Sequence, residues 1–491
     1  MKRIIAFVLI GYLLLVAFAH LDDHQLEFYD EARRSINAYE MAMGESHWLV
    51  PTYAGEADWF GTKPPLLVWS QALFIRLLGV DTLAIRLPAA LASLALVVLL
   101  VYWARREWGS GFIGLLAAII VYTSAEYVIT HGARSGEYDA MLVLFLTTQG
   151  VCVHRWVTTG QDKFVWCLGV AVLLAGYTKG VAGGFMLPSL GLWMLWTPAG
   201  RRQLTRYPIY VSVGGAILAV AAYYFAREAV DPGYIRQVNE MEWGGRYFAD
   251  RTAKSLGPRY YMEHLFNDKY FNVFFLIAPW SVFVAARKQR PLHPAYLSLF
   301  VAAIFLSIIS LAEMKLFWYK SPALPLVGLL AAYVLLHAAR LVVRQTRQPW
   351  AGVMFLAYVF AYPIYHTVTL VLEPSKHMYA DEEKIRYRSF LRDPAVSPPY
   401  IALSPEYNPV LRYQILGAQQ RGEDVRMAYA RNQMFPRGRQ AQSRIDTFSA
   451  GDRIVACHGE TQRFITDRYR ADTLYQQGPC QLVRIDGKLV R

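Results

Sequence analysis

The residues best suited to carry out chemistry lie between positions 30 and 63, directly after the first apolar run. Asp30 and Glu31 form an acidic pair in YDEARR, and Lys63 precedes two prolines in WFGTKPPL. A positioned carboxylate takes a proton from a hydroxyl group, and a fixed cation stabilises negative charge on a departing phosphate. Adjacent helix residues diverge around the axis, so we expect one carboxylate, Asp30, to face a site. The alternative interpretation is an acidic first turn that favours the helix dipole.

A second set of charged residues lies at the ends of later apolar runs. Asp139 follows Arg134 in ARSGEYD, and Lys179 lies between two apolar runs in GYTKG. A lysine at membrane depth is costly without an anionic partner, and a phosphate is a suitable one. The structural alternatives are snorkelling side chains, an Arg134–Asp139 ion pair and an interfacial aromatic belt. The predicted catalytic residues are Asp30, Glu31 and Asp139, and the predicted phosphate-binding residues are Lys63, Arg86, Arg134, Lys179, Lys315 and Tyr319.

The composition predicts a protein that crosses a membrane several times. Of its 491 residues, 55% are hydrophobic, and they form long uncharged runs that a soluble domain rarely contains. The formal net charge is +13. In a polytopic protein this charge fits basic cytoplasmic loops and an anionic substrate, so it does not indicate a nucleic-acid partner.

Eleven apolar runs are predicted to span the membrane. With the N-terminus inside, every short inner segment carries at least two cations, which agrees with the positive-inside rule. The first run is predicted to be an uncleaved helix, with a signal peptide as the alternative. The two runs around Lys179 have a re-entrant hairpin as their alternative. The runs lie at about residues 4–19, 83–103, 111–129, 139–157, 164–178, 181–197, 207–226, 270–285, 295–311, 322–339 and 350–372.

This topology places the charged candidates and two long loops, residues 20–82 and 227–269, on the outer face. Helical spacing of apolar residues predicts surface helices over 30–43 and 64–78 in the first loop. The tail, residues 373–491, contains the strand-like runs YIALS, RIVACHG and QLVRI and is long enough for a small α/β domain. Its cysteines, Cys457 and Cys480, are candidates for a disulfide that the sequence alone does not decide.

Several familiar motifs are absent from the sequence. It has no Gly-rich phosphate loop before a helix, no Cys/His metal spacing and no GxSxG. Nothing therefore points to a nucleotide or a nucleotide-sugar donor. No metal ligands are predicted, and a divalent metal is left open as a cofactor.

Taken together, the motifs resemble those of the GT-C membrane glycosyltransferases, in the branch of the lipid A aminoarabinose transferase and the protein O-mannosyltransferase-like enzymes. The resemblance covers residues 1 to about 340. It implies a polytopic α-helical membrane domain over 1–372 with about eleven transmembrane helices, and a C-terminal soluble α/β domain in the periplasm over 373–491. The matching segments are YDEARR at 29–34, KPPL at 63–66, RLPAAL at 86–91, ARSGEYD at 133–139, TKG at 178–180 and KLFWYKSPALP at 315–325.

The resemblance also implies an activity. It implies an inverting transferase of the bacterial inner membrane that uses a polyprenyl-phosphate sugar on the periplasmic face. Asp30 would be the base or orienter of the acceptor, and Asp139 a second acidic residue. Lys63, Arg134 and Lys179 would lie near the donor phosphate. Thr62 departs from the glutamate that related lipid A enzymes often carry before this lysine, which puts a metal site at that position in doubt.

The sequence leaves alternatives open for both the acceptor and the class of function. The acceptor is open between a glycolipid such as lipid A or core oligosaccharide, which we favour, a polysaccharide precursor, and a protein such as a pilin. The sequence also leaves the sugar, the metal requirement and the oligomeric state open. The alternative functions are a transporter or lipid flippase, and a non-catalytic assembly or sensor protein. Transporters place ionisable groups near the bilayer midplane, whereas these charges gather at one face.

Overall fold

The chain forms two compact units, each with its own hydrophobic core. The computed structural model describes residues 2–23, 26–27, 30–244, 257–267, 271–287, 292–373, 382–405, 408–430 and 447–489. Unit 1 comprises Met1–Leu21, Thr62–Leu67 and Arg86–Glu373, and unit 2 comprises Asp22–Gly61, Val68–Ile85 and Pro374–Arg491. The KPPL turn of the first predicted outer loop therefore belongs to unit 1, whereas most of that loop groups with the tail.

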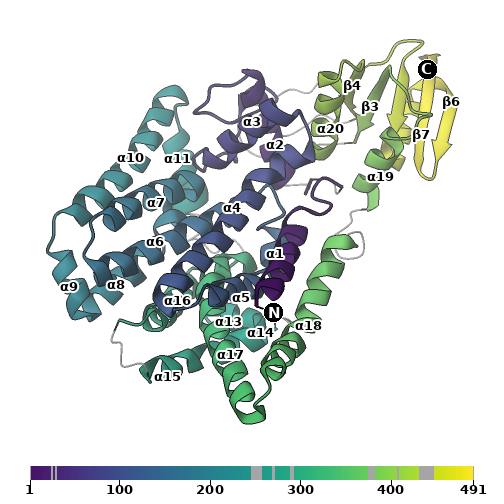
Figure 1. Ribbon diagram of the computed structural model, residues 1–491. Coiled ribbons are helices and arrows are strands. Elements are labelled where there is room, and N and C mark those ends of the chain that lie inside the picture. The colour runs from purple at the N-terminus through teal and green to yellow at the C-terminus, as the bar shows by residue number, and fades with distance from the viewer. Residues whose placement is uncertain are drawn as a thin grey trace. The chain divides into compact units, whose positions relative to one another are not determined.

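Unit 1 is helical in the part of the chain that the structure describes (Figure 1). Its longer helices are α1 (Lys2–Phe18), α4 (Thr82–Trp103), α5 (Gly111–Tyr122), α6 (Asp139–Thr159), α7 (Lys163–Lys179), α8 (Leu187–Trp196), α10 (Pro208–Val230), α16 (Pro294–Ser310), α17 (Leu324–Thr346) and α18 (Pro349–Leu372). Its shorter helices include α9 (Pro198–Leu204), α11 (Tyr234–Val238), α13 (Tyr260–Asn267), α14 (Asn272–Ile277) and α15 (Ser281–Ala286). Single turns of 3₁₀- or π-type include η1 (Ala104–Trp108), η2 (Glu126–Thr130), η3 (Gly180–Gly184), η4 (Asn239–Trp243), η5 (Ala278–Trp280) and η6 (Phe317–Ala323).

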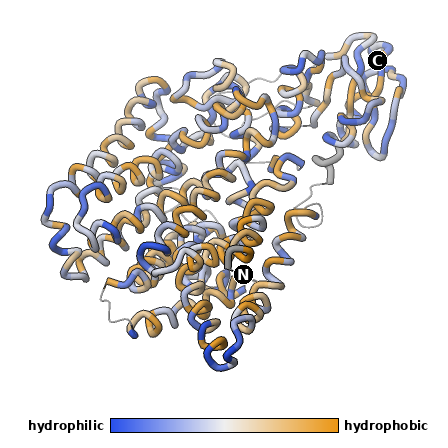
Figure 2. Tube along the Cα trace, viewed as in Figure 1, coloured by the Kyte–Doolittle hydropathy of each residue, from blue (hydrophilic) through white to orange (hydrophobic). Residues whose placement is uncertain are grey.

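Six of the described helical segments are long and apolar enough to cross a membrane, or seven if the bent pair 260–286 counts as one span. Shorter apolar helices occupy four more of the predicted runs, namely α1, α5, α8 and α16. Each of the eleven predicted runs thus coincides with helix, and the number that span the membrane stays a prediction. Figure 2 shows hydrophobic residues along these helices and hydrophilic residues at the turn between α17 and α18.

Close helix packing positions the C-terminal end of α7. Helix α7 packs between α6 and α10. A Cβ atom added at Gly176 of α7 would lie 2.5 Å from a methyl group of Val220 on α10. Small residues let apolar helices approach closely and pack tightly. The close contact at Gly176 therefore limits movement of the last turn of α7, which ends at Lys179.

Unit 2 begins with two helices, α2 (Asp30–Met43) and α3 (Leu66–Leu78), and a short antiparallel hairpin of β1 (Thr52–Tyr53) with β2 (Glu56–Ala57). Residues 66 and 67 of α3 belong to unit 1. The predicted helix over 30–43 is α2, with the same bounds. Its buried residues Ile36 and Tyr39 share a core with Val410 and Tyr413 of the tail. The tail therefore contributes to the core beneath α2.

The tail contains a five-stranded mixed sheet in the order β4-β3-β5-β7-β6. The predicted runs YIALS, RIVACHG and QLVRI form strands β3, β5 and β7. Strand β3 is buried along its whole length, as expected for a central strand between parallel neighbours. A disulfide joins Cys457 to Cys480. The strands are β3 (Tyr400–Ser404), β4 (Val425–Tyr429), β5 (Arg453–Ala456), β6 (Tyr469–Gln477) and β7 (Cys480–Lys488), and the helices are α19 (Glu382–Leu391), α20 (Pro409–Gln420) and α21 (Gly459–Thr466).

Candidate functional site

A buried ion pair joins the ends of two neighbouring helices in unit 1. Asp139 begins α6 and Lys179 ends α7, and the Lys179 Nζ donates a hydrogen bond to the Asp139 Oδ1 at 2.7 Å. Each charge also suits its helix, because an anion stabilises the N-terminus and a cation the C-terminus. The next residue, Gly180, has a φ of +58°, and a Cβ there would meet the Tyr224 hydroxyl at 2.5 Å. A glycine is therefore needed directly after Lys179.

A second cation, Lys63, is held by the segment that follows α10. The Lys63 Nζ lies 3.1 Å from the Glu242 Oε1, and the Thr62 hydroxyl donates to the same oxygen at 2.7 Å. The Tyr234 hydroxyl donates to the Thr62 carbonyl oxygen at 2.7 Å. The buried Arg227 guanidinium lies 3.9 Å from the centre of the Tyr234 ring. Contacts from 227–242 thus fix the backbone that carries Lys63.

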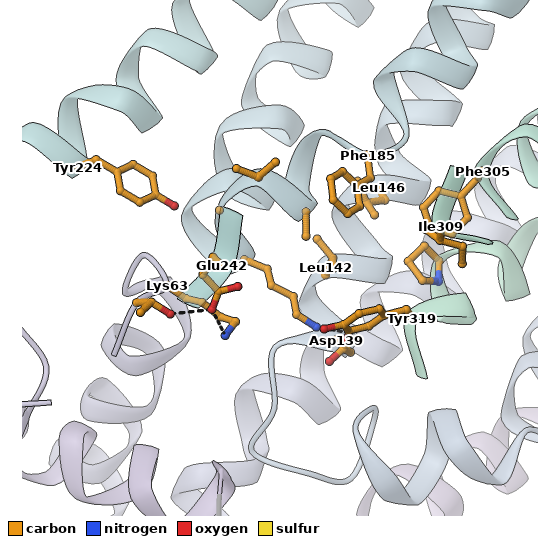
Figure 3. A pocket seen from close by; sticks show the side chains of 16 residues that line it. Lys63, Asp139, Leu142, Leu146, Phe185, Tyr224, Glu242, Phe305, Ile309 and Tyr319 are labelled. Carbon is orange, nitrogen blue, oxygen red and sulfur yellow. Dashed lines mark hydrogen bonds and ion pairs between the residues drawn. The ribbon is translucent and has the colours of Figure 1, made fainter. Parts of the chain in front are cut away.

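One cavity of unit 1 brings these two ion pairs together (Figure 3). Lys63 and Glu242 lie at one part of it, and Leu146, Phe185 and Phe305 line another. The Lys179 Nζ lies 5.3 Å from the centre of the Tyr319 ring, which also lines the cavity. The cavity is therefore amphipathic, with two ammonium groups beside an apolar wall. The lining residues are Thr62, Lys63, Asp139, Leu142, Leu146, Lys179, Gly180, Val181, Ala182, Phe185, Tyr224, Glu242, Phe305, Ile309, Tyr319 and Pro322.

Three of the predicted phosphate-binding residues have other contacts and are not among the lining residues of this cavity. The Arg86 Nη1 donates to the Leu21 carbonyl oxygen at 3.0 Å, and Arg134 donates to those of Val16 and Ala19 at 2.7 and 2.6 Å. Burial, together with the charge of Arg86, lowers the pKa of Arg134 to about 10. The Lys315 Nζ donates to the carbonyl oxygen of Ala312, three residues back. Arg134 thus binds the carbonyl end of α1, a position that favours cations, and Arg86 binds the segment just after this helix.

The structural alternative, an Arg134–Asp139 ion pair, is not seen among the described residues, where Asp139 binds Lys179 and Arg134 binds the carbonyl oxygens of Val16 and Ala19. Both side chains of the Lys179–Asp139 pair are largely buried, and both line the cavity.

Asp30 and Glu31 belong to unit 2 and differ in environment. The Asp30 carboxylate is about half exposed, with Arg34 at 3.1 Å and Arg33 at 3.4 Å. The Glu31 carboxylate is buried and accepts a hydrogen bond from the Glu27 amide at 2.7 Å. Asp30 is therefore the more accessible of the two, and its role as the acid that faces a site stays a prediction.

Sequence reasoning missed several residues near the cavity. Glu242 lies in the second predicted outer loop, whose mixture of charges and aromatics carried no specific signal. The loop's basic residues Arg246, Arg251 and Lys254 lie outside the described residues. His131 lies 3.5 Å from the Glu137 carboxylate, and its ring stacks on Trp318 with centroids 3.8 Å apart. Its position two residues before ARSGEYD was the available signal.

The carboxylates of Glu137 and Asp139 affect the pKa of His131. Burial lowers the pKa of His131, but the hydrogen bond and charge of Glu137 and the charge of Asp139 outweigh burial. The pKa of His131 is therefore raised above its ordinary value, which indicates a negative potential at the ring.

Comparisons with known proteins identify the fold of this chain. Residues 62–225 match the family model described as dolichyl-phosphate-mannose-protein mannosyltransferase. A crystal structure of ArnT from Cupriavidus metallidurans bound to undecaprenyl phosphate superposes with a TM-score of 0.65 at 15% identity, over 98% of this chain and 97% of that one. This chain has the GT-C glycosyltransferase fold. The resemblance predicted from the motifs is thereby confirmed at the level of the GT-C fold.

Curated relatives match this chain over shorter stretches. The undecaprenyl phosphate-alpha-4-amino-4-deoxy-L-arabinose arabinosyl transferase 2 of Sodalis glossinidius is 32% identical over 158 residues, which is 32% of this chain and 27% of that protein. A protein of Aquifex aeolicus is 25% identical over 285 residues, or 58% of this chain and 55% of that one. The chain thus spans about half or less of the length of the curated relatives it matches.

Proposed function

We propose that this protein is a membrane glycosyltransferase that moves a sugar from a polyprenyl-phosphate donor to an acceptor. The observation that carries the proposal is the amphipathic cavity of unit 1, where Lys63 and Lys179 stand beside an apolar wall. A lipid phosphate has the same division into a charged head and an apolar chain. An ammonium group has three donors, so Lys179 can hold Asp139 and also donate to a phosphate oxygen.

The proposed reaction is a single displacement at the anomeric carbon. The acceptor hydroxyl oxygen forms the new glycosidic bond, and the bond between that carbon and the phosphate oxygen breaks. The leaving polyprenyl phosphate takes the bonding electron pair, and the configuration inverts. Asp30 takes the proton of the acceptor hydroxyl. Cations at the phosphate stabilise the charge that develops on the leaving group, and this term is usually the largest in such reactions.

We place the reaction at the bacterial inner membrane, on its periplasmic side. Disulfides persist in oxidising compartments, so the Cys457–Cys480 bond supports a tail outside the cytoplasm. The charge of the predicted inner segments points to the same orientation.

An anionic glycolipid, such as lipid A or core oligosaccharide, is the acceptor we favour, with a protein such as a pilin as the alternative. A cavity within unit 2 is lined by three arginines, Arg388, Arg392 and Arg421, and by two acids, Asp81 and Glu423, of which Glu423 binds Arg421. Guanidinium groups bind phosphate oxygens well. Mass spectrometry of envelope lipids and pilins from cells with and without the gene would identify the acceptor and the sugar.

Donor binding tests the proposal directly. In the purified full-length protein, Lys179→Ala should weaken binding of undecaprenyl phosphate by roughly 10-fold or more, because a charge-assisted hydrogen bond contributes about 1.5–3 kcal/mol. Lys179→Arg should keep part of the affinity. Native mass spectrometry with undecaprenyl phosphate, and with undecaprenol as the uncharged ligand, would measure the effect.

The matched control is Lys163→Ala, which removes an exposed lysine from the other end of α7 and should leave affinity unchanged. Lys179→Ala also leaves the buried Asp139 without its partner, so Lys63→Ala serves as a second variant. If both variants fold and bind undecaprenyl phosphate as tightly as the native protein, the cavity is not the donor site.

A further inference from the structure

A compact group of potential metal ligands lies beside Lys179. The His131 Nδ1 is 3.5 Å from the Glu137 Oε2 and 4.0 Å from the Asp139 Oδ2. One ligand atom from each of the three side chains lies within 4.8 Å of the others, and all three residues are buried. Lys179 binds the other oxygen of Asp139. The Asp139 Oδ2 is therefore directed toward His131 and Glu137, away from the lysine.

The spacing of these atoms is close to that of a bound metal. Metal–ligand bonds of about 2.1 Å place neighbouring ligand atoms roughly 3.0–3.4 Å apart. The His131–Glu137 distance already approaches this value, and the widest pair must close by up to about 1.4 Å to reach it. Small rotations of the two carboxylates supply movements of this size. The group thus needs side-chain adjustment and no change of fold.

The backbone and neighbours hold the three side chains in place. His131 directly follows η2, and Asp139 is the first residue of α6, with Glu137 two residues before it. The His131 ring is stacked on Trp318 at an interplanar angle of 14°, which fixes the ring plane. Ligands that are oriented by packing bind a metal with less loss of side-chain freedom.

The charges also favour a cation. Glu137 and Asp139 carry two negative charges, and Lys179 compensates one of them through its bond to Asp139. The Glu137 carboxylate lies 3.5 Å from the His131 Nδ1, so a cation bound among the three side chains would have one imidazole and two carboxylate ligands. A metal ion and a proton on His131 compete for that position.

We propose that His131, Glu137 and Asp139 bind one divalent transition-metal ion of the Mn²⁺ or Zn²⁺ kind. One imidazole with two carboxylates suits these ions better than Mg²⁺ or Ca²⁺, which prefer oxygen-only sites. The bound ion adds positive charge next to Lys179. This charge would also attract a donor phosphate. That consequence rests on the proposed function, whereas metal binding itself does not.

Mn²⁺ binding to the purified full-length protein tests the site. After removal of metals with a chelator, the protein is titrated with Mn²⁺ and the free ion is followed by electron paramagnetic resonance. One ion per chain should bind, Zn²⁺ should displace it, and Mg²⁺ should compete poorly. Glu137→Gln and His131→Phe should each weaken binding by at least roughly 10–100-fold, because even the loss of an outer-shell partner has this effect.

The variants separate the site from other sources of binding. His131→Phe keeps an aromatic ring against Trp318 and removes both ring nitrogens, including the proposed ligand Nδ1. Glu313→Gln removes an exposed outer carboxylate and should bind Mn²⁺ as the native protein does. Absence of a stoichiometric ion in the native protein would overturn the proposal. So would unchanged affinity in both folded ligand variants. Because no lipid or sugar is present, these outcomes are distinct from a failure of the proposed function.

Discussion

Neighbouring acids in one helix turn have different environments. The Glu31 side chain is buried and turns back to the amide of Glu27, a residue that precedes α2. Asp30 points to Arg33 and Arg34 and keeps half of its side chain exposed. Only the second arrangement leaves a carboxylate accessible to an acceptor hydroxyl. The acidic pair therefore divides into one structural and one candidate catalytic residue.

Asp30→Asn should abolish transfer while leaving expression and membrane insertion intact. An amide keeps the shape of the side chain and cannot take the proton, and loss of a positioned base typically costs about 10²–10⁴-fold in rate. Restoration of the glycosylated product in cells that lack the gene would measure the effect. A folded variant that retains more than about a tenth of the product would exclude Asp30 as the base, given that range.

Glu31→Ala should instead reduce stability. Loss of one hydrogen bond of this kind costs about 0.5–1.5 kcal/mol. Thermal unfolding of the purified protein would show a lower midpoint, with transfer per folded molecule largely kept. A fully inactive, normally stable Glu31→Ala protein would reverse the division between the two acids.

At the scale of elements, the segment after α10 acts on the donor cavity through backbone contacts. Tyr234 of α11 binds the Thr62 carbonyl oxygen, and Glu242 of η4 binds both Thr62 and Lys63. Tyr234→Phe removes one hydroxyl and no packing. Because one hydrogen bond contributes about 0.5–1.5 kcal/mol, undecaprenyl phosphate should bind roughly 2–10-fold more weakly.

The control for this prediction is at the other end of α10. Tyr210 also donates to a backbone carbonyl oxygen at 2.7 Å, that of Leu204. Tyr210→Phe should therefore leave lipid-phosphate affinity unchanged. Equal affinity of the two variants, measured by titration in detergent, would mean that the Tyr234 contact does not position Lys63.

The elements were more predictable from the sequence than the partners within the site. The helical spacing of apolar residues in 30–43 and the strand-like run YIALS predicted α2 and β3 with their observed bounds. Local patterns suffice there because one helix face or one strand is buried. The partner of Lys63, however, is Glu242, 179 residues away. No local pattern encodes such a contact.

Arg134 shows the same limit at short range. It lies five residues before Asp139, yet it binds carbonyl oxygens at the end of α1. The order of charges along a loop does not fix which charges meet. That choice depends on which buried carbonyl or carboxylate lacks a partner once the helices have packed.

At the scale of the whole molecule, orientation in the membrane remains a prediction. The tail should lie outside the cytoplasm, because the short inner segments carry the basic residues. A reporter active only in the periplasm should be active when fused after Arg491 and silent when fused near Gln203. The reverse result would overturn the topology and the outer position of the candidate site.

The core of unit 2 joins segments that are far apart in the chain. Ile36 and Tyr39 pack with Val410 and Tyr413, so deleting the tail would expose the inner face of α2, which begins at Asp30. Loss of activity on truncation would then combine a missing acceptor surface with a displaced carboxylate. Point variants of the arginine-lined cavity separate the two effects better than deletion does.

The core of unit 2 can form only after the tail has been synthesised. A ribosome adds roughly 5–20 residues per second, so α2 waits about 20–70 s for the tail residues that cover it. Until then its apolar face lacks the tail residues that cover it in the folded protein. A chain that stops early, or whose tail is not translocated, never completes this core. The position of the Asp30 carboxylate therefore depends on the packing of the tail, which is synthesised long after α2.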